Sequence, residues 1–255
     1  TGSTGVDKIT ATDYTGTLTY TAEIESVIAT DIIKAGSGTA DEIKFTLDGS
    51  ADNIIASQFA NVTGFEKLTI SNNDAVGIIM SENNVADGKS MAVNASAVTT
   101  EIVTFSGAAE SDGTYTITLG GTGAHDITLG QLGDTLTSSS TGNLTVSATS
   151  GDNTITTGDG TDGITGGTGD DNITSGAGVD TISFASANLT SGDTVNGGDG
   201  TDIISLTTDG SVVVDSDFTN FSNVETLTIS DNSILTATLG KEAAEAGIVT
   251  VTLTD

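Results

Sequence analysis

A nine-residue repeat constrains the fold of this chain more than any other feature. Residues 157–165 read TGDGTDGIT, 166–174 read GGTGDDNIT, 175–183 read SGAGVDTIS and 197–205 read GGDGTDIIS. All four fit the pattern G-G-x-G-x-D-x-U-x, in which U is a large aliphatic residue. Glycine permits the positive φ angles of a tight turn, and x-U-x is a short strand with one inward side chain. Each nonamer therefore predicts one turn followed by one strand.

Weaker copies of the repeat extend the array over residues 120–137, 148–156 and 188–196. At the position of the repeat Asp they carry His125, Asp134, Asn153 and Asp193. We interpret His125 as a turn substitution and not as a metal ligand, because the chain contains no second histidine and no organised nucleophile.

Two nonamers make one coil of a solenoid, so turns 18 residues apart stack on the same edge. One predicted edge carries Asn153, Asp171 and Asp193, and the other carries Asp162, Asp180 and Asp202. The last step on each edge is 22 residues, which we interpret as a four-residue insertion at 184–187 that forms a bulge. The U residues predicted to point inward are Ile155, Ile164, Ile173, Ile182, Val195 and Ile204.

The turns suit a hard divalent cation. Stacked turns would offer carboxylates and main-chain carbonyls to one ion, and calcium takes six to eight oxygen ligands. Two inter-turn sites on each edge give about four calcium ions for the core array. The candidate metal-site residues are Asn153, Gly158, Gly160, Asp162, Gly167, Gly169, Asp171, Gly176, Gly178, Asp180, Asp193, Gly198, Gly200 and Asp202.

Charge supports the same expectation. The chain of 255 residues carries 35 Asp and Glu against 6 Lys and no Arg, for a net charge of −29. Such a chain repels itself when compact, so we expect the metal-free form to be largely unfolded and calcium to fold it. Carboxylates that bind calcium should have lowered pKa values in the loaded state, so acid should release the ion.

A second repeat lies in the flanks. Residues 59–73 (FANVTGFEKLTISNN) and 218–232 (FTNFSNVETLTISDN) are copies of one module. A Glu followed by alternating apolar residues recurs four times and predicts strands with one buried face. We favour a structural role for these glutamates, which would accept N–H bonds where the strand begins, over calcium binding; they are Glu25, Glu66, Glu101 and Glu225. Short helical connectors are expected at 241–246 and within 51–59.

Composition excludes several function classes. Without a basic stripe, neither nucleic-acid binding nor docking on an anionic membrane is expected. The absence of Cys and the single His exclude disulfide scaffolds and zinc sites. No apolar stretch is long enough to span a bilayer. The chain has no HExxH and no GxSxG, and no Trp that would line a sugar-cleaving site, so we predict that it is not an enzyme. It starts at Thr1 without a signal pattern, so we interpret it as a fragment or a processed product.

Residues 116–206 resemble the RTX, or haemolysin-type calcium-binding, repeats of bacterial type I-secreted proteins. The flanks 1–115 and 207–255, the latter holding the second copy of the module, resemble RTX-containing S-layer proteins and large surface adhesins. The resemblance rests there on N-V-x-x-F/V-E-x-L-T-I-S and on the stretches 87–97 and 107–123. It implies an all-β, right-handed parallel β-roll or β-helix solenoid stabilised by calcium, export by type I secretion, and an extracellular location at the bacterial cell surface.

Three functions remain open at this point. The leading one is a structural component of a surface layer that folds with calcium and self-assembles into a lattice. The second is a calcium-dependent adhesin segment that binds a sugar, ice or another cell, since Thr-rich strands such as 114–119 could present a flat hydroxyl face. The third is an accessory RTX domain of a secreted enzyme. Expected partners are further copies of the chain and a cell-surface polysaccharide.

Overall fold

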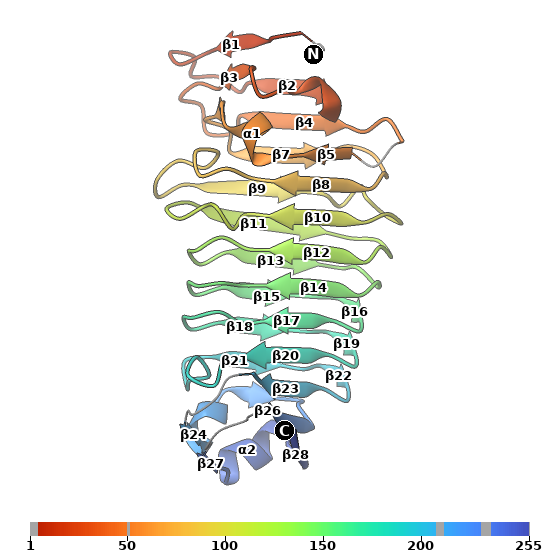
Figure 1. Cartoon of the computed structure of the whole chain (residues 1–255), viewed down its shortest axis with the longest axis vertical. Helices are drawn as coiled ribbons and strands as arrows, with labels where there is room; N and C mark the ends of the chain where they lie inside the picture. The colour runs from red at the N-terminus through yellow and green to blue at the C-terminus, as the bar shows by residue number, and fades with distance from the viewer. Residues whose placement is uncertain (1–4, 50–51, 208–211, 231–235, 255) are drawn as a thin grey trace.

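The fold is a parallel β-solenoid. The computed structural model describes residues 5–49, 52–207, 212–230 and 236–254. The chain winds into stacked coils whose strands form two ten-stranded sheets running the length of the molecule (Figure 1). Neighbouring strands within both sheets are parallel. The prediction of an all-β parallel solenoid is confirmed.

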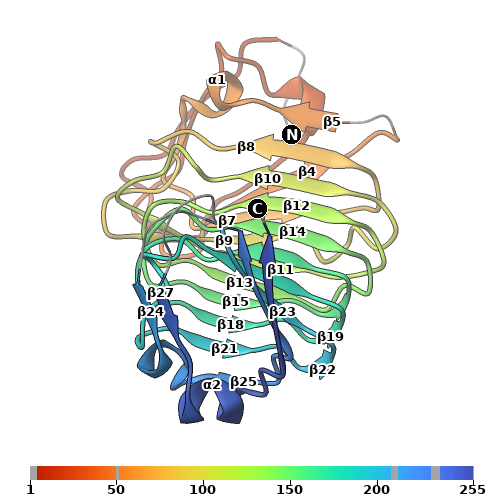
Figure 2. The same ribbon diagram turned by 60° about the horizontal axis from the view of Figure 1, so that its bottom comes forward.

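The two sheets form facing walls, which Figure 2 shows from the C-terminal end. In spatial order the first sheet contains β2 (Thr19–Glu23), β4 (Glu42–Thr46), β7 (Lys67–Ile70), β9 (Ser90–Asn94), β11 (Thr114–Leu119), β13 (Thr135–Ser138), β15 (Thr154–Thr156), β18 (Asn172–Thr174), β21 (Thr194–Asn196) and β25 (Phe221–Ser222). The second sheet contains β28 (Thr250–Thr254), β26 (Thr226–Ser230), β23 (Ile203–Leu206), β20 (Thr181–Phe184), β17 (Gly163–Thr165), β14 (Leu144–Ser147), β12 (His125–Thr128), β10 (Val103–Ser106), β8 (Val76–Ile79) and β5 (Asp52–Ile54).

Three smaller sheets lie along the connecting edges and at the ends. They are β1 (Lys8–Thr10), β3 (Ile32–Lys34) and β6 (Val62–Thr63); β16 (Asp159–Gly160), β19 (Ala177–Gly178) and β22 (Asp199–Gly200); and β24 (Val212–Val214) with β27 (Thr236–Thr238). The short helices are α1 (Ala56–Phe59) and α2 (Lys241–Ala246), with 3₁₀ turns at Ile24–Ser26 and Asp215–Phe218. Both helical connectors expected from the sequence are present. No helix in the described ranges is long and apolar enough to cross a membrane.

The core is a narrow stack of aliphatic side chains between the two walls. All six U residues of the repeat are at most 1% exposed, as predicted. In the first sheet Ile155 pairs with Ile173, which pairs with Val195; in the second sheet Ile164 pairs with Ile182. Each coil therefore contributes one inward residue per wall at this level, and successive coils cover one another.

The register confirms the predicted coil length. Thr145, Gly163 and Thr181 are partners in successive strands and lie 18 residues apart, whereas Thr181 and Ile203 are 22 apart. The prediction placed the insertion at 184–187, but Phe184 belongs to β20 and is fully buried. The extra residues therefore lie after Phe184, in the loop between β20 and β21.

The two copies of the flank module have matching local structure but lie on opposite walls. In each copy a short helix ends at a buried Phe, namely Phe59 or Phe218, before a two-residue strand. The E-x-L-T-I strand that follows is β7 in the first sheet but β26 in the second sheet. The copies are thus offset by half a coil, which is feasible because each wall presents the same apolar column to the core.

Glycine permits the closest approach of coils along β16, β19 and β22. Gly178 has φ +142°, and a Cβ added there would overlap the carbonyl oxygen of Gly160 in the preceding coil. A Cβ added at Gly163, the first residue of β17, would meet no atom within 4 Å.

These two glycines give a matched pair of substitutions. Gly178→Ala should lower the free energy of unfolding by about 3 kcal/mol or more, because both the backbone angle and the steric overlap must relax. Gly163→Ala should change it by less than about 1 kcal/mol. Denaturant unfolding in saturating calcium measures both, and equal losses would contradict the stacking described here.

Candidate metal centre

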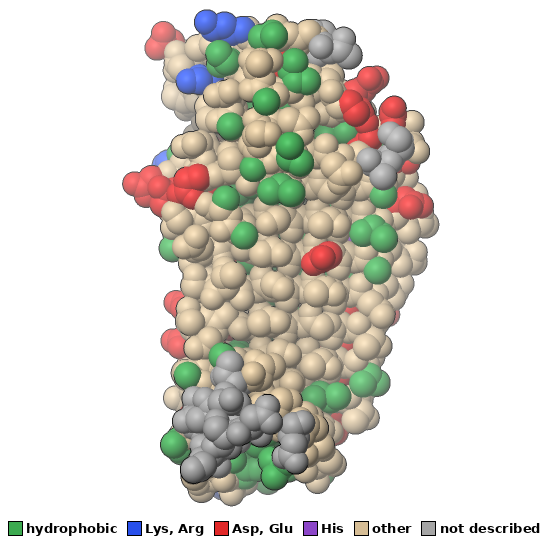
Figure 3. Space-filling model, viewed as in Figure 1, with side chains coloured by type: hydrophobic (Ala, Val, Ile, Leu, Met, Phe, Trp, Pro, Cys, Tyr) green, Lys and Arg blue, Asp and Glu red, His purple; other side chains and the backbone are tan. Residues whose placement is uncertain are grey.

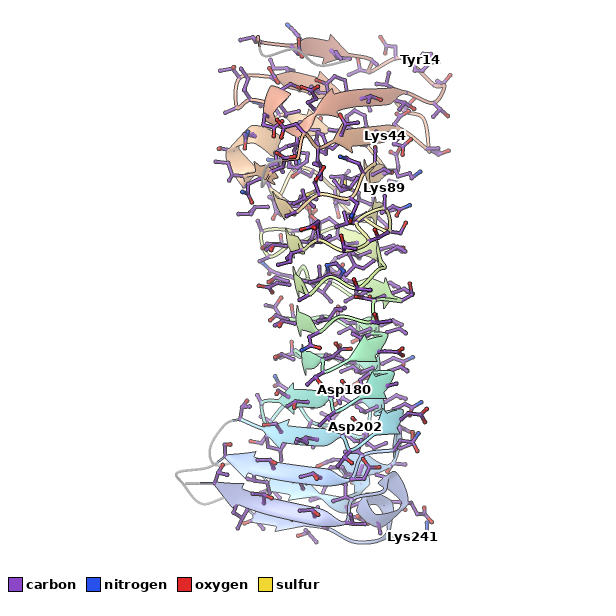
Figure 4. The ribbon with its side chains drawn as sticks, turned by 90° about the vertical axis from the view of Figure 1, so that its right-hand side faces the viewer. Tyr14, Lys44, Lys89, Asp180, Asp202 and Lys241 are labelled. Atoms are coloured by element: carbon purple, nitrogen blue, oxygen red, sulfur yellow. The ribbon has the colours of Figure 1, made fainter. Side chains whose placement is uncertain are left out.

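A ladder of carboxylates runs along one edge of the solenoid, at the residue just before the strands β17, β20 and β23 of the second sheet. The Oδ1 atom of Asp162 accepts the N–H of Leu144 at 2.7 Å. Asp180 Oδ1 accepts the N–H of Asp162 at 2.8 Å, and Asp202 Oδ1 accepts the N–H of Asp180 at 2.9 Å. Asp180 and Asp202 lie one above the other in successive coils (Figure 4). Each carboxylate therefore binds the main chain of the coil before it.

The opposite edge has the same ladder before the strands of the first sheet. Asp134 Oδ1 accepts the N–H of Tyr115 at 2.7 Å, and Asn153 Oδ1 accepts that of Asp134 at 2.9 Å. Asp171 and Asp193 continue the series, accepting the N–H of Asn153 and of Asp171, each at 2.9 Å. The predicted distribution of the repeat Asp residues over two stacked edges is confirmed.

Four of these carboxylates keep a buried oxygen with no hydrogen-bond partner. These are the Oδ2 atoms of Asp162, Asp171, Asp180 and Asp202, whose side chains are at most 1% exposed. An ionised oxygen buried in this way is costly unless a proton or a cation reaches it. Three of the four follow one another on the edge beside β16, β19 and β22.

Nearby hydroxyls do not donate hydrogen bonds to those oxygens. The hydroxyls of Thr157 and Ser175 lower the pKa of Asp162 and Asp180, respectively. However, Thr157 donates to the carbonyl of Ser175 at 2.7 Å, and Ser175 donates to the carbonyl of Gly197 at 2.8 Å. Both protons are therefore committed to the main chain.

Two of the candidate ligands offer no spare oxygen. Asn153 uses its Oδ1 in the ladder, and its Nδ2 donates to the carbonyl of Gly151 at 2.8 Å. Asp193 Oδ2 accepts the N–H of Thr190 at 2.8 Å, from the loop that holds the insertion. The arrangement therefore favours cation sites on the edge with Asp162 over an equal division between the two edges.

The candidate glycines divide between the same two edges. Gly167 and Gly169 lie in the turn that precedes Asp171, on the edge with Asn153. The other six precede the ladder Asp residues of the second sheet: Gly158, Gly160, Gly176, Gly178, Gly198 and Gly200. Their close stacking leaves main-chain carbonyls packed against the next coil, where Gly158 O accepts the N–H of Ala177 at 3.1 Å. The side chains of residues 157–162, 175–180 and 197–202 offer only oxygen atoms as ligands, which suits calcium and not a thiophilic metal.

His125 occupies a ladder position in place of Asp. Its Nδ1 accepts the N–H of Val103 at 3.1 Å, and its Nε2 lies 3.2 Å from the carbonyl oxygen of Gly120. Because Nδ1 accepts an N–H bond, the ring proton lies on Nε2, toward the carbonyl of Gly120, and burial lowers the pKa of His125. Both nitrogens are used within the fold, but His125 is the first residue of strand β12 and does not lie in a turn as expected.

Two of the four flank glutamates are also ladder residues. Glu66 Oε2 accepts the N–H of Asp41, and Glu225 Oε2 accepts the N–H of Asp202, each at 2.8 Å. Glu25 instead forms a hydrogen bond with Asp52, which raises the pKa of Glu25 to about 7 with a further contribution from burial. Glu101 is exposed in a turn. The structural role predicted for the set therefore holds for Glu66 and Glu225.

Burial raises the pKa values of the ladder carboxylates in the protein without metal. This holds for Asp162, Asp171, Asp180 and Asp193, and the pKa of Asp202 rises to about 6 through burial and the charges of Asp180 and Glu225. The lowered values expected for the calcium-loaded state thus require the ion itself. Protons and the ion compete for the same oxygens.

Comparison with known proteins found no matching protein family, no similar curated protein and no similar solved structure.

Asn at a ladder position keeps the Oδ1 acceptor but removes the charge. Asp180→Asn should therefore raise the calcium concentration at the midpoint of folding by at least about tenfold, because its free oxygen lies between two neighbouring free oxygens. Asp171→Asn should have a smaller effect, because its ladder neighbours Asn153 and Asp193 have no free oxygen to share an ion with it.

Asp126→Asn, on the exposed face of β12, is the charge-matched control and should leave the midpoint unchanged. Calcium titrations followed by circular dichroism measure all three variants. A midpoint for Asp171→Asn as high as that for Asp180→Asn would contradict the assignment of the principal cation sites to the edge with Asp162.

The raised pKa values predict a pH response in the metal-free chain. A carboxyl whose pKa is higher in the folded state than its unfolded value of about 3.9 stabilises the fold most below that value. This stability is lost as the pH rises through the folded pKa, which for Asp202 is about 6. Chelated protein should therefore gain β structure as the pH falls from about 7 to about 4.

The loaded protein should release its calcium over the same range and approach the β content of the chelated sample, because at about pH 4 both samples hold the same protonated, metal-free chain. In the chelated sample, Asp202→Asn should remove the gain of β structure at the upper end of this pH range. That result would separate the titration of Asp202 from a general loss of net charge. Parallel loss of β structure in both samples would rule out the raised pKa values.

Proposed function

We propose that this chain is a calcium-folded structural module of a bacterial surface layer. The observation that carries the proposal is the column of buried, unpartnered carboxylate oxygens in consecutive coils, at Asp162, Asp180 and Asp202. A binding energy supplied by an ion at such a column becomes folding energy, because the coils that hold the ion exist only in the folded state.

The chain itself offers no cation for these oxygens. No Lys or Arg occurs between Lys89 and Lys241, a stretch that includes the whole repeat array. The ion pairs of the described residues are made by Lys67 and Lys241, near the two ends. Neutralisation must therefore come from solution, and all-oxygen sites favour calcium.

The calcium requirement favours a location outside the cell. Calcium sites of extracellular modules typically bind in the range of about 10⁻⁴–10⁻³ M. A chain that depends on such sites would remain unfolded where calcium is scarce and fold after export. Export by a type I system to the cell surface is part of the proposal.

One end of the solenoid is suited to self-association. Val251 and Leu253 in β28 pair with Leu227 and Ile229, so they continue two columns of the core. They are 48% and 74% exposed, because no described segment covers them. A further coil, or a second copy of the chain, stacked on β28 would bury these side chains and extend the parallel sheet.

No catalytic role is proposed.

The first sheet favours a second candidate function, an adhesin. Its outward positions form two columns of hydroxyl side chains in register, Thr116–Thr135–Thr154 and Thr118–Thr137–Thr156. The second sheet also presents a largely uncharged face, with few acidic side chains over its middle (Figure 3). Regular, flat rows of hydroxyls could bind an ordered surface such as a polysaccharide or ice.

Circular dichroism and electron microscopy test the proposal together. Chelated protein at neutral pH should lack β structure, and millimolar calcium should restore it and produce ordered two-dimensional assemblies. A β spectrum that persists after thorough chelation would refute the role of calcium. Calcium-dependent folding without assembly, together with saturable binding to polysaccharide or ice that a Thr137→Lys change abolishes, would favour the adhesin.

A further inference from the structure

Three carboxylates from two successive coils meet outside the repeat array. Glu82 lies in the loop between β8 and β9, and Glu110 and Asp112 lie in the loop between β10 and β11. One carboxylate oxygen of each residue is within 4.8 Å of those of the other two. Acidic side chains gather on this edge of the molecule at the level of β9 (Figure 3).

The central member of this group is buried and incompletely satisfied. Glu110 is 0% exposed, and its Oε1 accepts the N–H of Gly113 at 3.0 Å and that of Asp112 at 3.3 Å. Its Oε2 is buried without a hydrogen-bond partner. The N–H of Val85 has a weaker lowering effect on the pKa but is not in hydrogen-bonding geometry with the carboxylate. A fully buried carboxylate oxygen of this kind requires a proton or a cation.

The surrounding groups favour a cation. Glu82 and Asp112 reach solvent, whereas no ion pair in the described part of the chain involves any of the three carboxylates. The hydroxyl of Ser111 donates to Glu82 Oε1 at 2.6 Å and so holds this side chain against the next coil. Three acidic groups are thereby held together without a positive partner.

The group also lies where the carboxylate ladder of this edge is interrupted. The ladder position in the coil of β9 is occupied by Met91, and its register partner at the ladder position in β11 is Tyr115. Neither side chain can accept the N–H of the preceding coil through a carboxylate. The coil-to-coil link that Asp41 and Glu66 make before this point, and Asp134 and Asn153 after it, is missing here.

We propose that Glu82, Glu110 and Asp112 bind one hard divalent cation, calcium, which ties the loop at 80–89 to the loop at 107–113. The three carboxylates supply the protein ligands, and water completes the shell on the side of Glu82 and Asp112. The ion takes the place of the missing carboxylate link between these coils. The site shares no carboxylate with the repeat array and does not depend on the proposed function.

Tyr115 provides an optical probe of this site. It follows the loop of Glu110 and Asp112, and its pKa is raised by burial and then by the charges of Glu110, Asp134 and Glu82. The chain has no Trp and only two other tyrosines, Tyr14 and Tyr20, near its N-terminus. Terbium bound beside Tyr115 should therefore emit when tyrosine is excited. Tyr115→Phe should abolish this part of the emission while leaving every carboxylate in place.

The test is a terbium titration of the full chain, with calcium as competitor. Glu110→Gln and Asp112→Asn should each raise the terbium concentration at half-saturation of the Tyr115-dependent emission by at least about tenfold. Asp87→Asn, an exposed acidic residue of the same loop as Glu82, should stay within about twofold of the unchanged chain. Calcium should displace the terbium.

Two results would overturn the proposal. One is full emission from Tyr115→Phe, which would place no ion near this tyrosine. The other is an unchanged half-saturation in both Glu110→Gln and Asp112→Asn. Circular dichroism in saturating calcium verifies the fold of each variant; if Glu110→Gln does not fold, the exposed Asp112→Asn decides the question.

Discussion

The repeat array depends on one hydrogen bond that is repeated from coil to coil. A side-chain oxygen placed just before a strand accepts the N–H of the equivalent residue in the preceding coil. This bond satisfies a buried main-chain donor and fixes the vertical register of the coils at the point where each wall begins. At Asp162, Asp171, Asp180 and Asp202 the fold uses only one of the two carboxylate oxygens, and the other is buried without a hydrogen-bond partner.

The repeat array could be predicted from the sequence in detail because its information is periodic. The coil length, the two edges and all six inward aliphatic residues follow from the spacing of Gly, Asp and U. The ladder role of Glu66 and Glu225 follows from their place before an alternating strand. In these cases one residue type at a fixed interval determines one position in space.

Other features could not be predicted because they depend on contacts that do not repeat. Asp193 has the sequence context of a ligand, yet the inserted loop supplies the N–H of Thr190 to its second oxygen. Glu82, Glu110 and Asp112 share no spacing with the repeat, and only the stacking of two irregular loops brings them together. The offset of the two flank modules onto opposite walls likewise depends on the number of residues in the intervening coils.

The ladder bonds have a direction, and that direction makes the two ends of the solenoid unequal. In every ladder pair of the array the donor belongs to the earlier coil and the acceptor side chain to the later one. Each coil within the array carries both groups: Asp180 accepts the N–H of Asp162 and donates its own N–H to Asp202. A stack of such coils therefore exposes side-chain acceptors at the end nearer the N-terminus and main-chain donors at the end nearer the C-terminus, so two stacks can continue the ladder only head to tail.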